Sequence, residues 1–141
     1  MSEESSIPDG LRGNAEFFVQ TMMPERVRAS LTYDAAGVEL VDGYIGQFRD
    51  HILPETRTRF VSAVGAFLGE CIVKTYGGKW EQMNGTWGVR VSEHLWADPF
   101  TSVRRQLDGE PFKSVLSFFQ SLPRVEKLMR EQNEKRKRGG Q

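Results

Sequence analysis

The feature that most constrains the fold is a change of hydrophobic period at the double glycine 77–78. Before it, the segment at about 56–76 carries apolar residues at helical steps of three and four around much of its circumference. After it, residues 79–96 alternate between apolar and polar, which is typical of strands, and Asn84-Gly85 is a strong signal for a type I′ hairpin turn. The pattern predicts a largely buried helix that ends at the glycines, followed by a short antiparallel β-meander.

The residues before this helix predict a broken helical arm over 1–31 and then one amphipathic helix. Asp34 is a favourable N-cap residue, and the apolar residues after it fall on one helical stripe. These apolar residues are Val38, Val41, Ile45, Phe48 and Ile52. We expect Pro54 to end this helix.

Two more helices are expected after the meander. Asp98-Pro99 places a cap before a first-turn proline, and Asp108-Gly109 marks the end of that helix. A last core helix is expected at about 111–122, with Pro123 separating it from a charged tail. Its predicted inner face consists of Phe112, Val115, Leu116 and Phe119. The chain is thus predicted to be one α+β domain over 1–123, with helices, a meander at about 79–96, and C-terminal helices.

Charge is balanced overall but uneven along the chain. Nineteen basic and nineteen acidic residues cancel, so the whole molecule has neither the basic excess of a typical nucleic-acid binder nor that of a membrane-surface protein. From Arg124 to Arg138, however, seven basic residues oppose three acidic ones, which leaves +4 there and −4 on the first 123 residues. The tail over 124–141 is therefore the candidate segment for contact with RNA, DNA or an acidic protein, although the commonest meaning of such a basic run is a solvated, frayed helix end.

Cysteine usage and the N-terminus favour the cytoplasm. Cys71 is the only cysteine, which excludes an intramolecular disulfide and a zinc site built from several thiolates. The first ten residues are acidic and polar, unlike a secretory signal, and no segment approaches the roughly 20 apolar residues of a membrane span. We expect a cytoplasmic protein without membrane contact.

Two glycines lie four residues apart within the expected buried helix. Gly65 and Gly69 each lower helix stability by up to about 1 kcal/mol relative to alanine. The spacing predicts that another backbone packs closely against them.

Few side chains have the grouping that catalysis requires. Cys71 is expected mid-helix on the apolar face, where a thiol is protonated and unreactive. His51 and His94 are far apart and lack metal-ligand spacing. No phosphate-binding glycine motif is present, and no cofactor or metal is expected.

Glu70 is the most informative ionisable residue, because it is the only charge between Arg59 and Lys74. On a helix with so much apolar surface, a carboxylate needs a cation or hydrogen-bond donors. Candidate partners are Arg90, Arg104 and the indole of Trp80. Glu70 is interpreted mainly as a structural ion pair, with a perturbed carboxylate in a cleft as the alternative. The candidate functional cluster is Glu70, Trp80, Arg90 and His94.

Three short motifs resemble those of a family of small bacterial α+β proteins of uncharacterised function. They are GAFLGE at 65–70, GGKW at 77–80 and Pro99-Phe100 at a helix start. The resemblance covers 34–119 and implies an α+β fold, but it supplies no activity and no catalytic residues.

The predicted function is a non-enzymatic protein–protein interaction module of a bacterial cytoplasm, such as an immunity-type, adaptor or regulatory protein. Its partner would be another protein. One alternative is a nucleic-acid-associated protein that uses the basic tail residues Lys135, Arg136, Lys137 and Arg138. Another is an enzyme with Glu70 and His94 in a cleft. Neither the partner's identity nor the oligomeric state follows from the sequence.

Overall fold

The computed structural model describes residues 31–139 and, before them, Gly10, Gly13, Ala15 and Phe18. Apart from these four residues and Leu31, the arm predicted over 1–31 lies outside the described residues. The elements are α3 (Ala35–Phe48), the 3-10 helix η2 (Arg49–His51), α4 (Pro54–Tyr76), β1 (Lys79–Met83), β2 (Thr86–Ser92), β3 (Leu95–Ala97), α5 (Pro99–Leu107) and α6 (Val115–Gly139). This order confirms the α+β class, with helices before and after a three-stranded antiparallel sheet.

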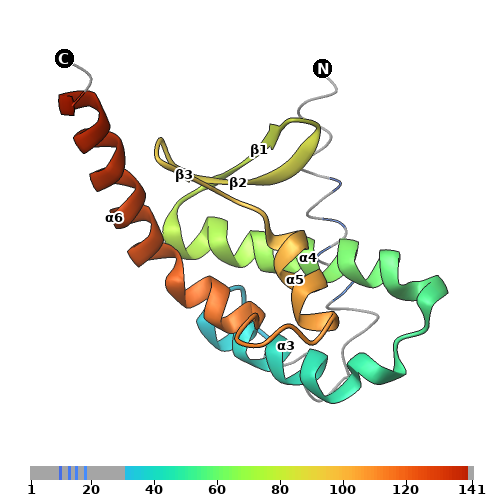
Figure 1. Ribbon diagram of the computed structural model, residues 1–141. Coiled ribbons are helices and arrows are strands. Elements are labelled where there is room, and N and C mark those ends of the chain that lie inside the picture. Colours follow the sequence, from blue (N-terminus) through green and yellow to red (C-terminus); the bar gives the residue numbers. More distant parts are fainter. Residues whose placement is uncertain (1–9, 11–12, 14, 16–17, 19–30, 140–141) are drawn as a thin grey trace.

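Helix α4 is the centre of the fold. Nearly every residue of 60–72 is buried, as the wide apolar surface of this segment predicted. The sheet lies over one side of α4, and α3 with the first part of α6 lies on the other side (Figure 1). The helix ends at Gly77, whose φ of 79° places it in the left-handed conformation that closes many helices.

Pro54 does not end α3, as predicted, but begins α4. Helix α3 stops at Phe48, and η2 with two extended residues leads to Pro54 at the first position of α4. Proline suits that position because its missing N–H would have no partner in the first helical turn. The start of α3 is as predicted, since the Asp34 side chain accepts a hydrogen bond from the Gly37 N–H at 3.2 Å.

The face of α4 that carries Gly65 and Gly69 packs against aromatic rings, and not against another backbone as predicted. A Cβ at Gly65 would overlap the ring of Phe100, and one at Gly69 would overlap the indole of Trp80. The two rings also contact each other, with centroids 6.1 Å apart. Flat rings fill the space above each glycine because the hairpin and α5 reach α4 with their side chains.

The hairpin and α5 have the predicted turns and caps. Asn84 and Gly85 form the turn between β1 and β2 with φ values of 52° and 80°, as a type I′ turn requires. The Asp98 carboxylate caps α5 by accepting from the Phe100 and Thr101 N–H groups. Gly109, with φ 73°, follows the end of α5.

Helix α6 differs most from the prediction. It begins at Val115 rather than about 111, and it continues through Pro123 to Gly139 instead of stopping there. Phe112, predicted to belong to the core, lies in the preceding loop with φ 62° and a 96% exposed side chain. Figure 1 shows α6 changing direction part-way, as proline-containing helices do.

Pro123 is tolerated inside α6 because its missing hydrogen bond is replaced. The carbonyl four residues earlier, that of Phe119, accepts from the Tyr76 hydroxyl at 2.9 Å. The end of α4 thereby satisfies a group that proline leaves without its usual helical donor.

Candidate functional site

Glu70 is a buried carboxylate in the described core. The residue is 5% exposed, and its Oε2 accepts from the Trp80 indole Nε1 at 3.1 Å. Trp80 is one of the three partners that the sequence suggested. The bond ties β1 to α4 beside Gly69, where the same indole packs.

The other two members of the predicted cluster make contacts elsewhere. Arg90 on β2 forms a two-point ion pair with Glu81 of β1, with Nη2 and Nε lying 2.7 and 2.9 Å from Oε2. His94 lies in the turn between β2 and β3, against α6. Its contacts link the sheet to that helix.

Two polar contacts join the β2–β3 turn to α6. Asn133 Nδ2 lies 2.9 Å from Nδ1 of His94, whose Nε2 is 3.0 Å from a Glu93 carboxylate oxygen. Ser92 donates to the Glu126 carboxylate at 2.8 Å. Sequence reasoning missed the roles of Asn133 and Glu126, because no local pattern indicates that residues 34 and 39 positions apart meet.

Cys71 and His51, the other candidates from the sequence, lie in different surroundings. Burial raises the pKa of the Cys71 thiol far above its usual range, so the sulfur is protonated at neutral pH, as expected for a core cysteine. His51 is exposed in η2. Among the described residues, no three histidine, cysteine or carboxylate side chains gather as a metal site.

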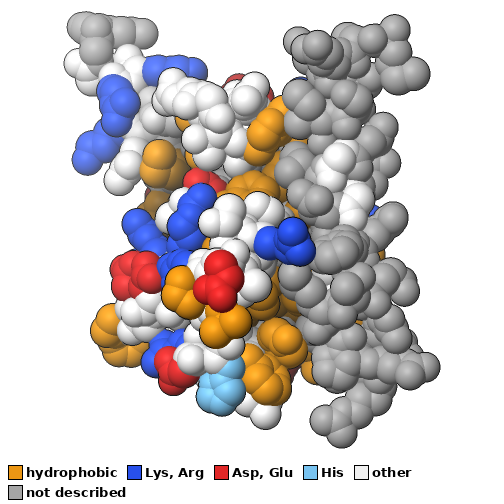
Figure 2. All heavy atoms as spheres, turned by 90° about the vertical axis from the view of Figure 1, so that its right-hand side faces the viewer, with side chains coloured by type: hydrophobic (Ala, Val, Ile, Leu, Met, Phe, Trp, Pro, Cys, Tyr) orange, Lys and Arg blue, Asp and Glu red, His pale blue; other side chains and the backbone are white. Residues whose placement is uncertain are grey.

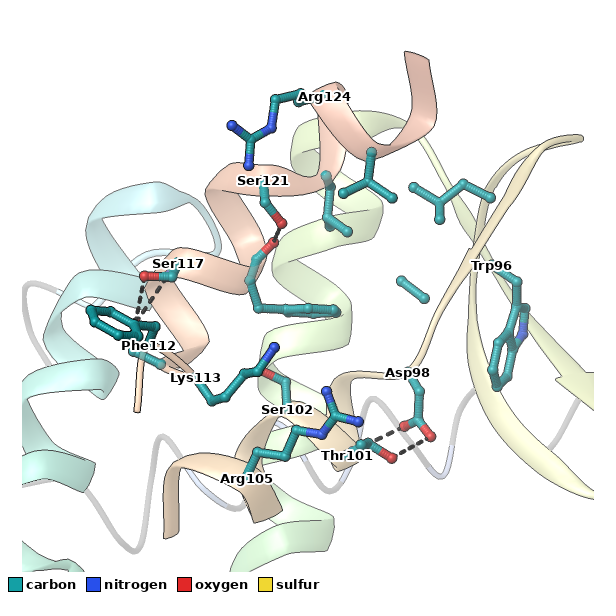
Figure 3. Close-up of a pocket in the computed structure, with 16 residues that line it drawn as sticks. Trp96, Asp98, Thr101, Ser102, Arg105, Phe112, Lys113, Ser117, Ser121 and Arg124 are labelled. Atoms are coloured by element: carbon teal, nitrogen blue, oxygen red, sulfur yellow. Dashed lines mark hydrogen bonds between the residues drawn. The ribbon is translucent and has the colours of Figure 1, made fainter. Parts of the chain in front are cut away.

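A pocket of about 530 Å³ opens between β3, α5 and α6 (Figure 3). Leu95, Ala97 and Leu122 are its buried apolar lining residues, and three exposed cations also line it. The cations are Arg105, Lys113 and Arg124. Neither Glu70 nor His94 lines this pocket. Sequence analysis missed it because its walls come from three separate segments.

The last part of α6 is the second exposed feature. We call residues 124–139 the α6 extension. Its side chains Leu128 and Met129 are 50% and 38% exposed, and the predicted partner-binding residues 135–138 are all exposed. Figure 1 shows the extension pointing away from the helical layer below α4.

Comparisons with protein-family models, curated proteins and solved structures find no match to this chain. The resemblance indicated by GAFLGE and GGKW therefore stays a prediction. No helix within the described residues has the length and apolar character needed to cross a membrane.

Proposed function

We propose that the protein is a non-enzymatic protein–protein interaction module, and that the α6 extension is its binding element. The observation that carries this proposal is the exposure of Leu128 and Met129 on a helix that continues out of the core. Large apolar side chains exposed together on a helix are typical of surfaces that a partner covers.

The spacing of the apolar residues suits binding in a groove. Leu128 and Met129 follow Val125 by three and four positions, so the three side chains share one helical face. A helix of this kind places that face in an apolar groove of its partner. The basic residues at 135–138 extend the same helix and favour a groove with an acidic rim.

The extension is ordered before binding. The contacts from Ser92 to Glu126 and from His94 to Asn133 hold its first part against the sheet. A helix that is already formed loses less conformational entropy on association than a disordered segment does. We therefore propose an acidic protein as the partner, with the chain acting as an immunity-type, adaptor or regulatory protein in a bacterial cytoplasm.

The test compares how much partner protein is recovered with a variant of the α6 extension and with a variant of a different exposed apolar surface. The full-length protein, a Leu128→Asp/Met129→Asp variant and a Leu40→Asp/Leu53→Asp control would each be used for affinity purification from the native host. Leu40 and Leu53 are exposed to a similar degree but lie on α3 and before α4. We expect an acidic protein with the full-length chain and the control, and its loss with the α6 variant. Equal recovery with all three proteins contradicts the proposal.

A second candidate function, nucleic-acid association, is favoured only by the four consecutive exposed cations at 135–138. On the face turned to the viewer in Figure 2, basic, acidic and apolar side chains are interspersed over the described residues. Nucleic-acid binding through these cations would fall steeply with salt and would be lost in a variant with residues 135–138 changed to glutamine. Nuclease-sensitive recovery of partners would favour this alternative over direct protein contact.

The third candidate, an enzyme that uses Glu70 with His94, has weaker support. Glu70 contacts Trp80, whereas His94 contacts Glu93 and Asn133. The two groups thus take part in separate described contacts, and the pocket is lined by neither.

A further inference from the structure

We propose that the pocket between β3, α5 and α6 binds a small amphipathic organic anion, with a carboxylate or phosphate head group and an apolar body. This pocket adjoins the α6 extension that we propose as the protein-binding element, because Arg124 and Val125 belong to the extension and also line the pocket. Leu128 and Met129 do not line it.

The first observation is an excess of positive charge in the lining. Arg105, Lys113 and Arg124 line the pocket, and among the described residues no carboxylate lies within ion-pair distance of any of them. Asp98 is the one acidic side chain in the lining, and it is occupied as the cap of α5. An anion in this pocket would therefore meet three cations that form no ion pair within the described residues.

The second observation is a pocket hydroxyl that no group of the described residues engages. Ser102 is 7% exposed and lines the pocket, and its side chain makes no hydrogen bond within the described residues. Other hydroxyls around the pocket are committed, since Ser121 donates to the Phe118 carbonyl and Thr101 donates to Asp98. No buried side-chain oxygen of the described residues lacks a partner, so the Ser102 hydroxyl is accessible at the pocket and can donate to a ligand oxygen.

The arrangement of these groups defines a head-group position. In the view of Figure 3, Arg105, Lys113 and Ser102 lie on the same side of the pocket, and Arg124 lies on the opposite side. Arg105 and Ser102 come from α5, and Lys113 comes from the loop before α6. Two cations and a hydroxyl donor suit the oxygens of one carboxylate or phosphate group.

Seven of the other twelve lining residues are apolar, and they suit the body of the ligand. Among them Leu95, Ala97 and Leu122 are buried, and Val125 is half-buried. The volume of about 530 Å³ lies within the usual range of about 300–1,000 Å³ for small-molecule sites. Phe112 lines the same pocket and is almost fully exposed, so an apolar ligand would cover part of its ring.

The experiment is calorimetric titration of the full-length protein with four probes: octanoate, octyl phosphate, inorganic phosphate and 1-octanol. We expect octanoate or octyl phosphate to bind, and to bind more tightly than both inorganic phosphate and 1-octanol, because only these two probes use both parts of the pocket. The carboxylate and phosphate probes together show which head group is preferred.

Three variants locate the binding. Arg105→Gln/Lys113→Gln should weaken binding of the preferred probe by about tenfold or more, the size expected for loss of charged hydrogen bonds. Arg104→Gln/Lys127→Gln is the matched control. Arg104 lies on α5 and Lys127 on α6, both are exposed, and neither lines the pocket. Ser102→Ala should weaken binding less. Circular dichroism verifies that each variant is folded.

Three outcomes overturn the proposal. The first is no binding of either amphipathic anion. The second is equal binding of 1-octanol or inorganic phosphate, which would show that one half of the pocket is not used. The third is an equal effect of the Arg105/Lys113 variant and its control, which would place the anion elsewhere on the surface.

Discussion

At the scale of single residues, the two glycines of α4 decide how closely the aromatic rings approach. Gly65 and Gly69 lie under Phe100 and Trp80, where any larger side chain would overlap a ring. The packing gained there offsets the lower helix propensity of glycine.

We expect Gly69→Ala to lower the free energy of unfolding by about 1–3 kcal/mol, the usual range for overpacking. Gly46→Ala on α3 is the matched control, because Gly46 is exposed and a Cβ there would have no neighbour within 4 Å. The control should instead raise the free energy of unfolding by about 0.5–1 kcal/mol, through helix propensity. Urea denaturation measures both. A Gly69→Ala variant as stable as the control would mean that the indole can move away.

Glu70 gives the second prediction at this scale. Glu70→Ala removes the acceptor of the Trp80 N–H and should lower the free energy of unfolding by about 1–3 kcal/mol. Glu70→Gln retains an acceptor oxygen and should be less damaging. In a Trp80→Phe background, the loss from Glu70→Ala should shrink, because the donor is already absent. Unchanged stability together with loss of an identified activity would assign Glu70 to catalysis instead.

At the scale of elements, the end of α4 supports the proline in α6. Tyr76→Phe should lower the free energy of unfolding by about 0.5–1.5 kcal/mol, because the Phe119 carbonyl loses its donor. In a Pro123→Ala background the loss should be smaller, since residue 123 then has an N–H that can donate to the same carbonyl. Urea denaturation of the two single variants and the double variant tests this coupling. Equal losses in both backgrounds would show that the two donors are independent.

The α6 extension gives the second prediction for an element. A chain that ends at Asn133 keeps the contacts of Glu126 and Asn133 with the β2–β3 turn, and it loses only exposed residues among those described. Its melting temperature should stay within a few degrees of that of the full chain. A chain that ends at Pro123 loses both contacts and should melt at a clearly lower temperature. A large decrease for the longer of these two chains would place residues beyond 133 in the stable fold.

At the scale of the whole molecule, burial is concentrated on one helix. Helix α4 contacts the sheet, α3 and α5, and nearly all of its residues 60–72 are buried. Residues 134–139 of α6, in contrast, are all exposed. Amide hydrogen exchange should therefore be slowest in α4 and fastest near the end of α6. Exchange in α4 as fast as in the α6 extension would contradict a core built around this helix.

The elements were predictable from the sequence where local chemistry decides them. Asp34 and Asp98 cap helices, Asn84-Gly85 turns the hairpin, and Gly77 closes α4, because each conformation depends on the residue itself and its close neighbours. The α+β class followed from the change of hydrophobic period at the double glycine.

The place of Pro123 inside a helix and the exposure of Phe112 were decided by the tertiary structure. Pro123 was predicted to end a helix, but Tyr76, 47 positions earlier in the sequence, replaces the missing hydrogen bond. Phe112 was predicted to be buried, but the loop before α6 turns its ring outwards.

The same division applies to the candidate sites. The sequence by itself determined that Glu70 needs a partner and offered Trp80 among three, because burying a carboxylate is unfavourable on any fold. Only the tertiary structure decided that His94 faces α6 and that Arg105 and Lys113 line one pocket with Ser102. Residues of β3, α5 and α6 meet there because α6 contacts both α5 and β3. Contacts between distant segments leave no signal in local hydrophobic spacing.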